Sequence, residues 1–145
     1  MIPTHITLHH SLTKDSGTAS WDAIRKYHKE LGWLDIGYHF GIELIGSSYE
    51  VLLGRMPFET GAHCKEHGMN HTSLGICFVG NFDIEKPSDA MWKKGLSLCS
   101  SLCRIFNISI ENIHGHSYYA GYKSCPGKMF DVEKFKKDLK HEGRK

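Results

Sequence analysis

The chain has 145 residues, of which 40% are hydrophobic and 23% charged, and its formal net charge is +2. This is the composition of a globular protein, and the length predicts one domain over residues 1–145. A net charge this small gives no reason to expect a nucleic-acid partner. No apolar run approaches the ~20 residues of a membrane span, and the N-terminus lacks the pattern of a secretory signal. We therefore expect a protein made in the cytoplasm.

Five cysteines are an odd number, and their spacing is not that of a small disulfide scaffold. Cys77 lies in an apolar run, and Cys99 and Cys103 are four positions apart on a predicted helix, so core packing is expected for all three. Cys64 falls in a predicted loop, where we expect an exposed free thiol.

The first half of the chain predicts a strand, a helix and a hairpin. Residues 2–10 alternate apolar and polar side chains as a strand does, so His9 and His10 point to opposite faces and only one can face a given site. A helix follows from an N-cap at Ser20 to Gly32, with Leu31 on its buried face. Residues 33–44 are predicted to run into a strand, which a turn at 46–48 connects to a return strand over 49–54.

The second half begins with a long polar segment, residues 55–72, of the kind that is usually functional in a compact domain. Residues 73–82 are nearly all apolar and predict a central strand buried on both faces. A helix over 87–106, a short strand over 108–114 and a last helix from Asp131 complete the chain. Interleaved strands and helices predict an α/β fold, with a central mixed β-sheet flanked by three main helices.

The stretch from His114 to Asp131 holds the residues that best fit a metal site. His116 and Cys125 are nine positions apart, and His9 or His10 offers a third donor. Two histidines and one cysteine form a catalytic rather than a structural zinc set, because a fourth position stays open for water. His114 lies two positions from His116 on the same face of a strand, so spacing leaves either as the ligand. Chance pairing among eleven histidines is the competing explanation.

Four further residues are candidates around such a metal. Lys123, two positions before Cys125, could stabilise negative charge on a carbonyl oxygen, although a solvent-facing loop lysine is the simpler interpretation. The hydroxyl of Tyr38 could donate a proton near the metal, or belong to an ordinary half-buried tyrosine. His63 and Asn70 lie in the long polar segment and could bind a polar substrate, or His63 could cap a turn.

These motifs, taken together in order and spacing, resemble the zinc N-acetylmuramoyl-L-alanine amidases of the type 2 amidase and peptidoglycan recognition protein superfamily. The resemblance is strongest to small single-domain phage endolysins and runs from His9 to about Asp131. The matching segments are Leu-His-His-Ser at 8–11, Tyr-His-Lys-Glu-Leu-Gly-Trp-Leu-Asp-Ile-Gly-Tyr-His-Phe at 27–40, Gly-Ala-His at 61–63, Asn-His-Thr-Ser-Leu-Gly-Ile-Cys-Phe-Val-Gly-Asn-Phe at 70–82, Gly-His at 115–116 and Lys-Ser-Cys-Pro-Gly at 123–127.

The resemblance implies a role for each matching residue. His9, His116 and Cys125 correspond to the three zinc ligands, and Tyr38 and Lys123 to the tyrosine and lysine that phage members need for catalysis. The gap between His116 and Cys125 is one residue longer than in close phage members, so Lys123 is placed by counting back from Cys125. Many recognition proteins that bind wall fragments without cutting them lack the cysteine, and its presence favours an active enzyme. The family fold implied is a central mixed sheet of about five or six strands.

The activity implied is zinc-dependent hydrolysis of the amide between N-acetylmuramic acid and L-alanine of peptidoglycan, with one Zn²⁺ per chain. Lys123 would stabilise the developing oxyanion, Tyr38 would orient water or assist proton transfer, and the 55–72 segment would bind peptide and glycan through His63 and Asn70. The sequence predicts a single amidase domain with no separate wall-binding domain. The enzyme would reach the bacterial wall after release or delivery from the cytoplasm.

Two other functions stay open from the sequence. The first is a non-catalytic module that binds peptidoglycan, and the second is a cysteine hydrolase with Cys125 as nucleophile. Related phage amidases also bind and inhibit a viral RNA polymerase, so the resemblance makes a polymerase a further candidate partner. No residue of this sequence indicates that interaction by itself. We expect a monomer.

Overall fold

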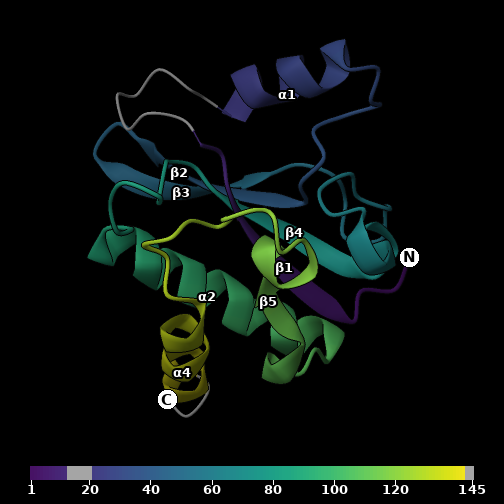
Figure 1. Ribbon diagram of the computed structural model, residues 1–145. Helices are drawn as coiled ribbons and strands as arrows, with labels where there is room; N and C mark the ends of the chain where they lie inside the picture. The colour runs from purple at the N-terminus through teal and green to yellow at the C-terminus, as the bar shows by residue number, and fades with distance from the viewer. Residues whose placement is uncertain (13–20, 143–145) are drawn as a thin grey trace.

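The computed structural model describes residues 1–12 and 21–142, and its centre is one five-stranded sheet (Figure 1). Its strands in sheet order are β3 (Ser48–Leu53), β2 (Phe40–Ile45), β4 (Ser73–Phe78), β1 (His5–His10) and β5 (Ile113–Gly115). β1 is parallel to β4 and β5, and β2 is parallel to β4 but antiparallel to β3. The predicted α/β fold with a mixed sheet is therefore confirmed.

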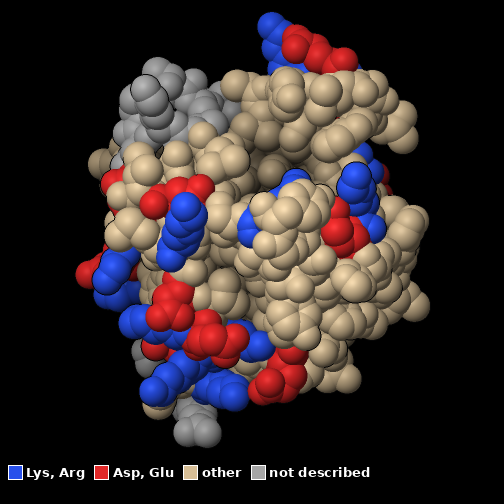
Figure 2. Space-filling model, viewed as in Figure 1, with Lys and Arg blue, Asp and Glu red and all other residues tan. Residues whose placement is uncertain are grey.

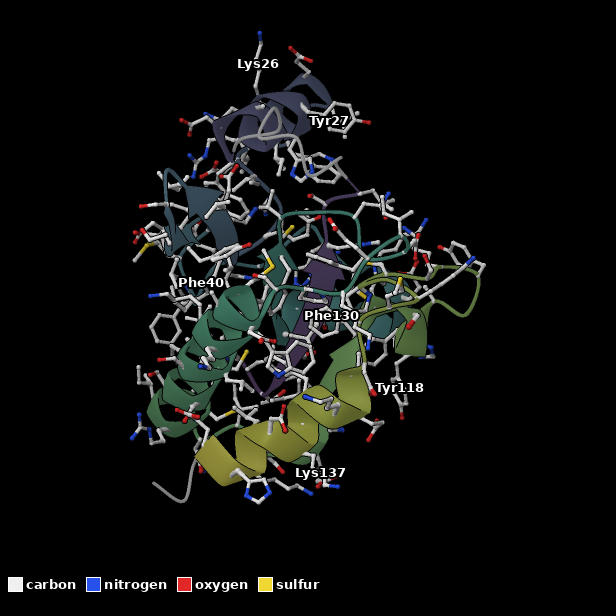
Figure 3. All side chains as sticks on the ribbon, turned by 90° about the vertical axis from the view of Figure 1, so that its left-hand side faces the viewer. Lys26, Tyr27, Phe40, Tyr118, Phe130 and Lys137 are labelled. Atoms are coloured by element: carbon white, nitrogen blue, oxygen red, sulfur yellow. The ribbon has the colours of Figure 1, made fainter. Side chains whose placement is uncertain are left out.

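Helices cover both faces of the sheet. The four α-helices among the described residues are α1 (Trp21–Glu30), α2 (Asp89–Phe106), α3 (His116–Tyr119) and α4 (Val132–Glu142), and 3-10 turns lie at Glu66–His71 and Ile110–Asn112. In Figure 1, α1 lies above the sheet, and α2 and α4 lie below it. The turned view of Figure 3 agrees, with Lys26 and Tyr27 of α1 at one end, Lys137 of α4 at the other and Phe130 between them.

The two faces of the sheet carry different side chains. Ile6 and Leu8 of β1 point toward α2 and α4, where they join a large apolar core. Thr7 and His9 alternate to the opposite face, so β1 presents polar groups on the side that α1 covers. All six residues of β4 are buried, as predicted for a central strand. One face thus supplies the apolar core, and the other is free to build a polar site.

Local signals placed the ends of α2 and the buried face of α4 correctly. The Ser88 hydroxyl accepts a hydrogen bond from the Met91 amide and caps α2, and Asn107 ends that helix in a left-handed conformation. Val132, Phe135 and Leu139 of α4 pack against the apolar core as predicted. The predicted N-cap at Ser20 lies outside the described residues.

Several sequence predictions about elements were wrong. The strand predicted over residues 73–82 ends at Phe78. The strand predicted from residues 33–44 begins only at Phe40, because the Gly37 amide donates to His28 Nδ1 and the Gly37 carbonyl accepts from the Ala62 amide, so Gly37 pairs with α1 and the 55–72 segment and not with a strand. The strand predicted at 108–114 shrinks to β5, since a 3-10 turn that Ser109 caps occupies its first part. Leu31, predicted on the buried face of the first helix, lies just past the end of α1 and is 51% exposed.

The cysteines lie mostly where core packing was expected. Cys77 and Cys99 are fully buried, and Cys103 is partly buried against the apolar core. The prediction of an exposed thiol at Cys64 was wrong, because the chain folds back after it and leaves this side chain 1% exposed beside Glu66. Within residues 1–12 and 21–142, none of the helices has both the length and the apolar character needed to cross a membrane.

Candidate metal centre and active site

The C-terminal ends of two neighbouring strands bring three potential metal ligands together. His9 lies near the end of β1, His116 begins α3 directly after β5, and Cys125 lies in the loop that follows α3. One donor atom from each residue lies within 4.8 Å of the others. Neither histidine that spacing left as an alternative belongs to this group: His10 accepts from the Phe82 amide through Nδ1, and the His114 ring stacks on Tyr118 at 3.7 Å.

A chain of hydrogen bonds fixes the orientation of His9. His63 Nε2 lies 3.1 Å from the Ser73 carbonyl oxygen, which can only accept, so this nitrogen of His63 carries the proton. His63 Nδ1 must then accept from His9 Nε2, 2.9 Å away. The remaining nitrogen of His9, Nδ1, keeps its lone pair and lies 3.5 Å from the Cys125 sulfur. His9 is therefore held in the tautomer that offers Nδ1 to a metal.

His116 is held in the same way by a carboxylate. Its Nε2 lies 2.9 Å from Glu66 Oε1, which leaves Nδ1 as its unpaired nitrogen. Burial lowers the pKa of both His9 and His116 below the ordinary value of 6.5. Neutral imidazoles are the form that binds metals, so both rings already have the protonation state that a metal ligand requires.

The loop around Cys125 is anchored on both sides. Asp83 accepts from the Ser124 hydroxyl at 3.0 Å and from the Lys128 amide at 2.9 Å, and the His10 amide lies 3.4 Å from the Cys125 sulfur. Burial raises the pKa of the Cys125 thiol to about 12. Such a thiol stays protonated near neutral pH unless a cation stabilises the thiolate, which is what a metal ion does.

The spacing between two of the three donors fits zinc. A tetrahedral ion with bonds of about 2.05 Å to nitrogen and about 2.3 Å to sulfur holds those two atoms about 3.5 Å apart. The distance between His9 Nδ1 and the Cys125 sulfur is 3.5 Å. Two imidazoles and one thiolate also suit a borderline-soft ion better than magnesium or calcium, which prefer oxygen ligands.

The three residues line a cavity of about 490 Å³. Figure 2 shows that this face of the molecule is hollowed between α1 and the segments below it. Tyr38 and Lys123 line the same cavity. The Tyr38 ring lies 5.1 Å from the His9 ring, and burial raises the pKa of Tyr38 well above 10, so its hydroxyl is a proton donor. Lys123 is exposed at the rim.

His63 and Asn70, predicted to bind substrate, line cavities at the site and also make hydrogen bonds within the protein. Both ring nitrogens of His63 have protein partners, and its ring packs where a side chain at Gly75 would otherwise stand. Asn70 Oδ1 accepts from the amides of His63 at 2.7 Å and Cys64 at 2.8 Å. These bonds make His63 a positioning residue for His9, and direct substrate contact by either residue stays a prediction.

Two acidic residues that were not predicted from the sequence take part in the site. Glu66 pairs with His116, and Asp83 holds the loop that carries Cys125. Neither stands in a recognisable motif, because each acts through a contact between distant segments. Cys64, Glu66 and His116 also form a second group of donors within 4.8 Å of one another.

Comparison with known proteins identifies the family of this chain. The N-acetylmuramoyl-L-alanine amidase family matches residues 1–128. The endolysin of Escherichia phage T7 is 45% identical over 135 residues, covering 90% of this chain and 83% of the endolysin. Peptidoglycan-recognition protein SC2 of Drosophila melanogaster is 33% identical over 132 residues, covering 86% of this chain and 68% of that protein.

Solved structures show the same likeness. An endolysin N-acetylmuramoyl-L-alanine amidase from Clostridium intestinale superposes with a TM-score of 0.84 at 28% identity, over 97% of this chain and 85% of that one. The family match covers most of the sequence, and the fold agrees over nearly its whole length. This chain therefore belongs to the N-acetylmuramoyl-L-alanine amidase family.

Proposed function

We propose that this protein cleaves the amide bond between N-acetylmuramic acid and the L-alanine of peptidoglycan stem peptides, using one zinc ion bound by His9, His116 and Cys125. The observation that carries the proposal is the convergence of these three donors within 4.8 Å at the floor of an open cavity. Family membership supports the reaction, and the named activity of the Clostridium intestinale enzyme supports the bond that is cut.

Some residues of the site would bind and orient the zinc ion, and others would stabilise the charge that develops on the substrate. Zinc, when bound, supplies a Lewis acid that lowers the pKa of a water molecule and polarises a carbonyl group. His63 and Glu66 keep the ring nitrogens of His9 and His116 turned toward the ion. An ion with three protein ligands keeps a position open, which is the arrangement of catalytic rather than structural zinc sites.

Lys123 and Tyr38 act on the substrate. The Lys123 ammonium group, at the rim of the cavity, donates to the carbonyl oxygen of the scissile amide as negative charge develops there. The protonated Tyr38 hydroxyl, whose ring lies 5.1 Å from the His9 ring, orients the attacking water or gives a proton to the departing amine of L-alanine. Both groups line the same cavity as the three ligands, so a substrate bound there lies beside the proposed ion and both of these side chains.

Binding of peptidoglycan without cleavage is the main alternative, since the chain is also similar to a peptidoglycan-recognition protein. The complete ligand trio, including Cys125, argues for cleavage. Mass spectrometry of purified wall after digestion separates the two functions, because only an amidase releases stem peptides with a free L-alanine amino terminus. Absence of such peptides under zinc-loaded conditions would leave binding as the function.

A cysteine hydrolase is the second alternative, and the environment of Cys125 argues against it. Its buried thiol has a pKa of about 12, whereas a nucleophilic cysteine needs a lowered pKa. An alkylating reagent separates the two mechanisms, since inactivation of the zinc-loaded enzyme without loss of zinc would support a nucleophilic Cys125.

The remaining features of the proposal concern the whole chain. Residues 1–145 form one catalytic domain that works as a monomer and acts on the bacterial wall once released or delivered there. An interaction with RNA polymerase, implied by the resemblance to phage amidases, stays a prediction that a pull-down with purified polymerase tests.

The metal requirement is tested by removal and return. A chelator should abolish wall hydrolysis, and stoichiometric zinc should restore it. Full activity in metal-free protein would contradict the proposed centre.

A further inference from the structure

We propose that Glu66 is a positioning residue that holds His116 in its metal-binding tautomer and ties it to the loop that carries Lys123. This inference rests on the proposed zinc centre and deepens it. Glu66 lies in the 3-10 turn Glu66–His71, fifty positions before His116 in the chain, and was not among the residues that the sequence suggested. Its contacts therefore depend on how the 55–72 segment folds over the site.

The first contact fixes the tautomer of His116. An ionised carboxylate accepts hydrogen bonds only, so the 2.9 Å contact between Glu66 Oε1 and His116 Nε2 requires a proton on that nitrogen. The lone pair of the imidazole then resides on Nδ1, the nitrogen available to the proposed metal. The side chains are 7% exposed for His116 and 15% for Glu66, so water competes little for either group. Carboxylate–histidine pairs of this kind orient metal ligands and raise their basicity.

The second contact reaches the loop after α3. The Tyr122 hydroxyl donates to Glu66 Oε2 at 3.0 Å, so the two carboxylate oxygens hold two different segments. Tyr122 precedes Lys123, and both residues line the main cavity. One carboxylate thus couples a proposed metal ligand to the loop that presents the proposed oxyanion donor. A substitution at Glu66 should disturb both, whereas a substitution at Tyr122 should disturb the loop alone.

Some of the same residues could instead bind a second metal ion, and this possibility must be distinguished from the positioning role of Glu66. Cys64, Glu66 and His116 together could hold a second ion, since the Cys64 sulfur lies 3.7 Å from Glu66 Oε1. In that arrangement Nε2 of His116 would bind a metal instead of donating to Glu66. The contact of 2.9 Å between nitrogen and oxygen is an ordinary charge-assisted hydrogen bond, which is why we assign Glu66 the positioning role.

The test measures zinc affinity by competition with a chromophoric chelator, for the full chain and four variants. Glu66→Ala should bind zinc about 10- to 100-fold more weakly than the unmodified chain. Glu66→Gln, whose amide oxygen can still accept from His116, should recover part of that loss. Tyr122→Phe should keep the affinity of the unmodified chain but lower kcat. Cys64→Ser should keep both that affinity and a stoichiometry of one zinc per chain.

A spectroscopic readout separates positioning from general loss of structure. With cobalt in place of zinc, Glu66→Ala should change the visible absorption of the ion, while thermal unfolding of the metal-free variants should show that they remain folded. If Glu66→Ala binds zinc as tightly as the unmodified chain, or if Glu66→Gln is no better than Glu66→Ala, the positioning role is wrong. Loss of a second zinc ion in Cys64→Ser would also overturn it, in favour of a second metal site.

Failure of this inference is distinguishable from failure of the proposed function. If the unmodified chain binds no zinc, the proposed centre itself fails. If it binds zinc tightly and only the Glu66 variants behave unexpectedly, the centre stands and the role of Glu66 falls.

Discussion

At the scale of single residues, the hydrogen bonds within the protein decide which ring nitrogen of each histidine is available to a metal. His63 accepts a hydrogen bond from Nε2 of His9, and Glu66 accepts one from Nε2 of His116. Nδ1 of each ring is therefore available to the proposed ion. Neither histidine has to lose a proton when a metal arrives, because burial already favours the neutral rings. Cys125 is the one ligand that has to deprotonate on binding.

Lys123 provides a test of charge stabilisation that leaves the metal alone. Lys123→Ala should lower kcat by about 100- to 1000-fold, because a donor to the developing oxyanion is lost. Zinc content should not change, since Lys123 is not among the three grouped donors. Lys128→Ala is the matched control, because that lysine is also exposed in the loop and its contact with Asp83 comes from its backbone amide. An unimpaired Lys123→Ala enzyme would remove this lysine from the mechanism.

A substitution at Tyr38 that removes only the hydroxyl oxygen tests whether this residue transfers protons or orients water. Tyr38→Phe keeps the ring that packs beside His9 but removes the hydroxyl. If that hydroxyl orients water or donates a proton, kcat should fall by about 100-fold or more. Zinc affinity should stay close to that of the unmodified chain, and stability should fall by no more than about 1 kcal/mol for the lost hydrogen bond with Cys77. Steady-state release of stem peptides measures the effect, and equal kcat in the two proteins would leave Tyr38 with a packing role only.

At the scale of elements, the site depends on close approach between β4 and the 55–72 segment. A Cβ atom at Gly75 would come within 2.6 Å of the His63 ring, so only glycine leaves room for that ring against β4. His63 in turn fixes the tautomer of His9. A glycine in the middle of a strand therefore determines the position of a ligand in the neighbouring strand.

Gly75→Ala should consequently affect stability and metal binding together. Forcing the His63 ring away from β4 should cost about 1 to 3 kcal/mol of stability, the usual range for overpacking. Zinc affinity should fall as well, since His9 loses its partner. Gly121→Ala is the control, because a Cβ there meets no atom within 4 Å. Urea unfolding and chelator competition measure the two effects, and a Gly75→Ala protein unchanged in both would contradict this account.

The elements also show what can be predicted from the sequence and what cannot. Alternation and apolar runs were enough for β1, β4 and the buried face of α4, because these elements face one apolar core. Apolar residues in the segment 33–39 suggested an extension of the strand, but the hydrogen bonds of Gly37 to His28 and Ala62, which hold it outside the sheet, join distant positions that no local pattern reveals. Glu66 could not be found, since its partners His116 and Tyr122 lie at least fifty positions away.

At the scale of the whole molecule, buried histidines should make stability depend on pH. His28 and His39 each accept a hydrogen bond from a backbone amide, at Gly37 and Gly75, and this requires the neutral ring. Burial lowers the pKa of both below the ordinary 6.5. The unfolded chain therefore binds more protons than the folded chain below about pH 6.5, and folding stability falls as pH decreases through that range.

Urea unfolding of the metal-free protein between pH 8 and pH 5 tests this expectation. The midpoint should be nearly constant above about pH 7 and should fall steadily below about pH 6.5. His39→Gln should show a shallower fall, because one of the groups that take up protons on unfolding is gone. A midpoint that rises on acidification would contradict the assignment of neutral buried rings.

The most direct test of the account combines metal content with product analysis on the same preparations. Purified protein and its Cys125→Ala variant are loaded with zinc, dialysed, assayed for bound metal and incubated with purified peptidoglycan. We predict one zinc ion per chain and stem peptides with a free L-alanine amino terminus for the unmodified protein, and loss of both for Cys125→Ala. Release of those peptides by Cys125→Ala, or by protein that holds no zinc, would contradict the account.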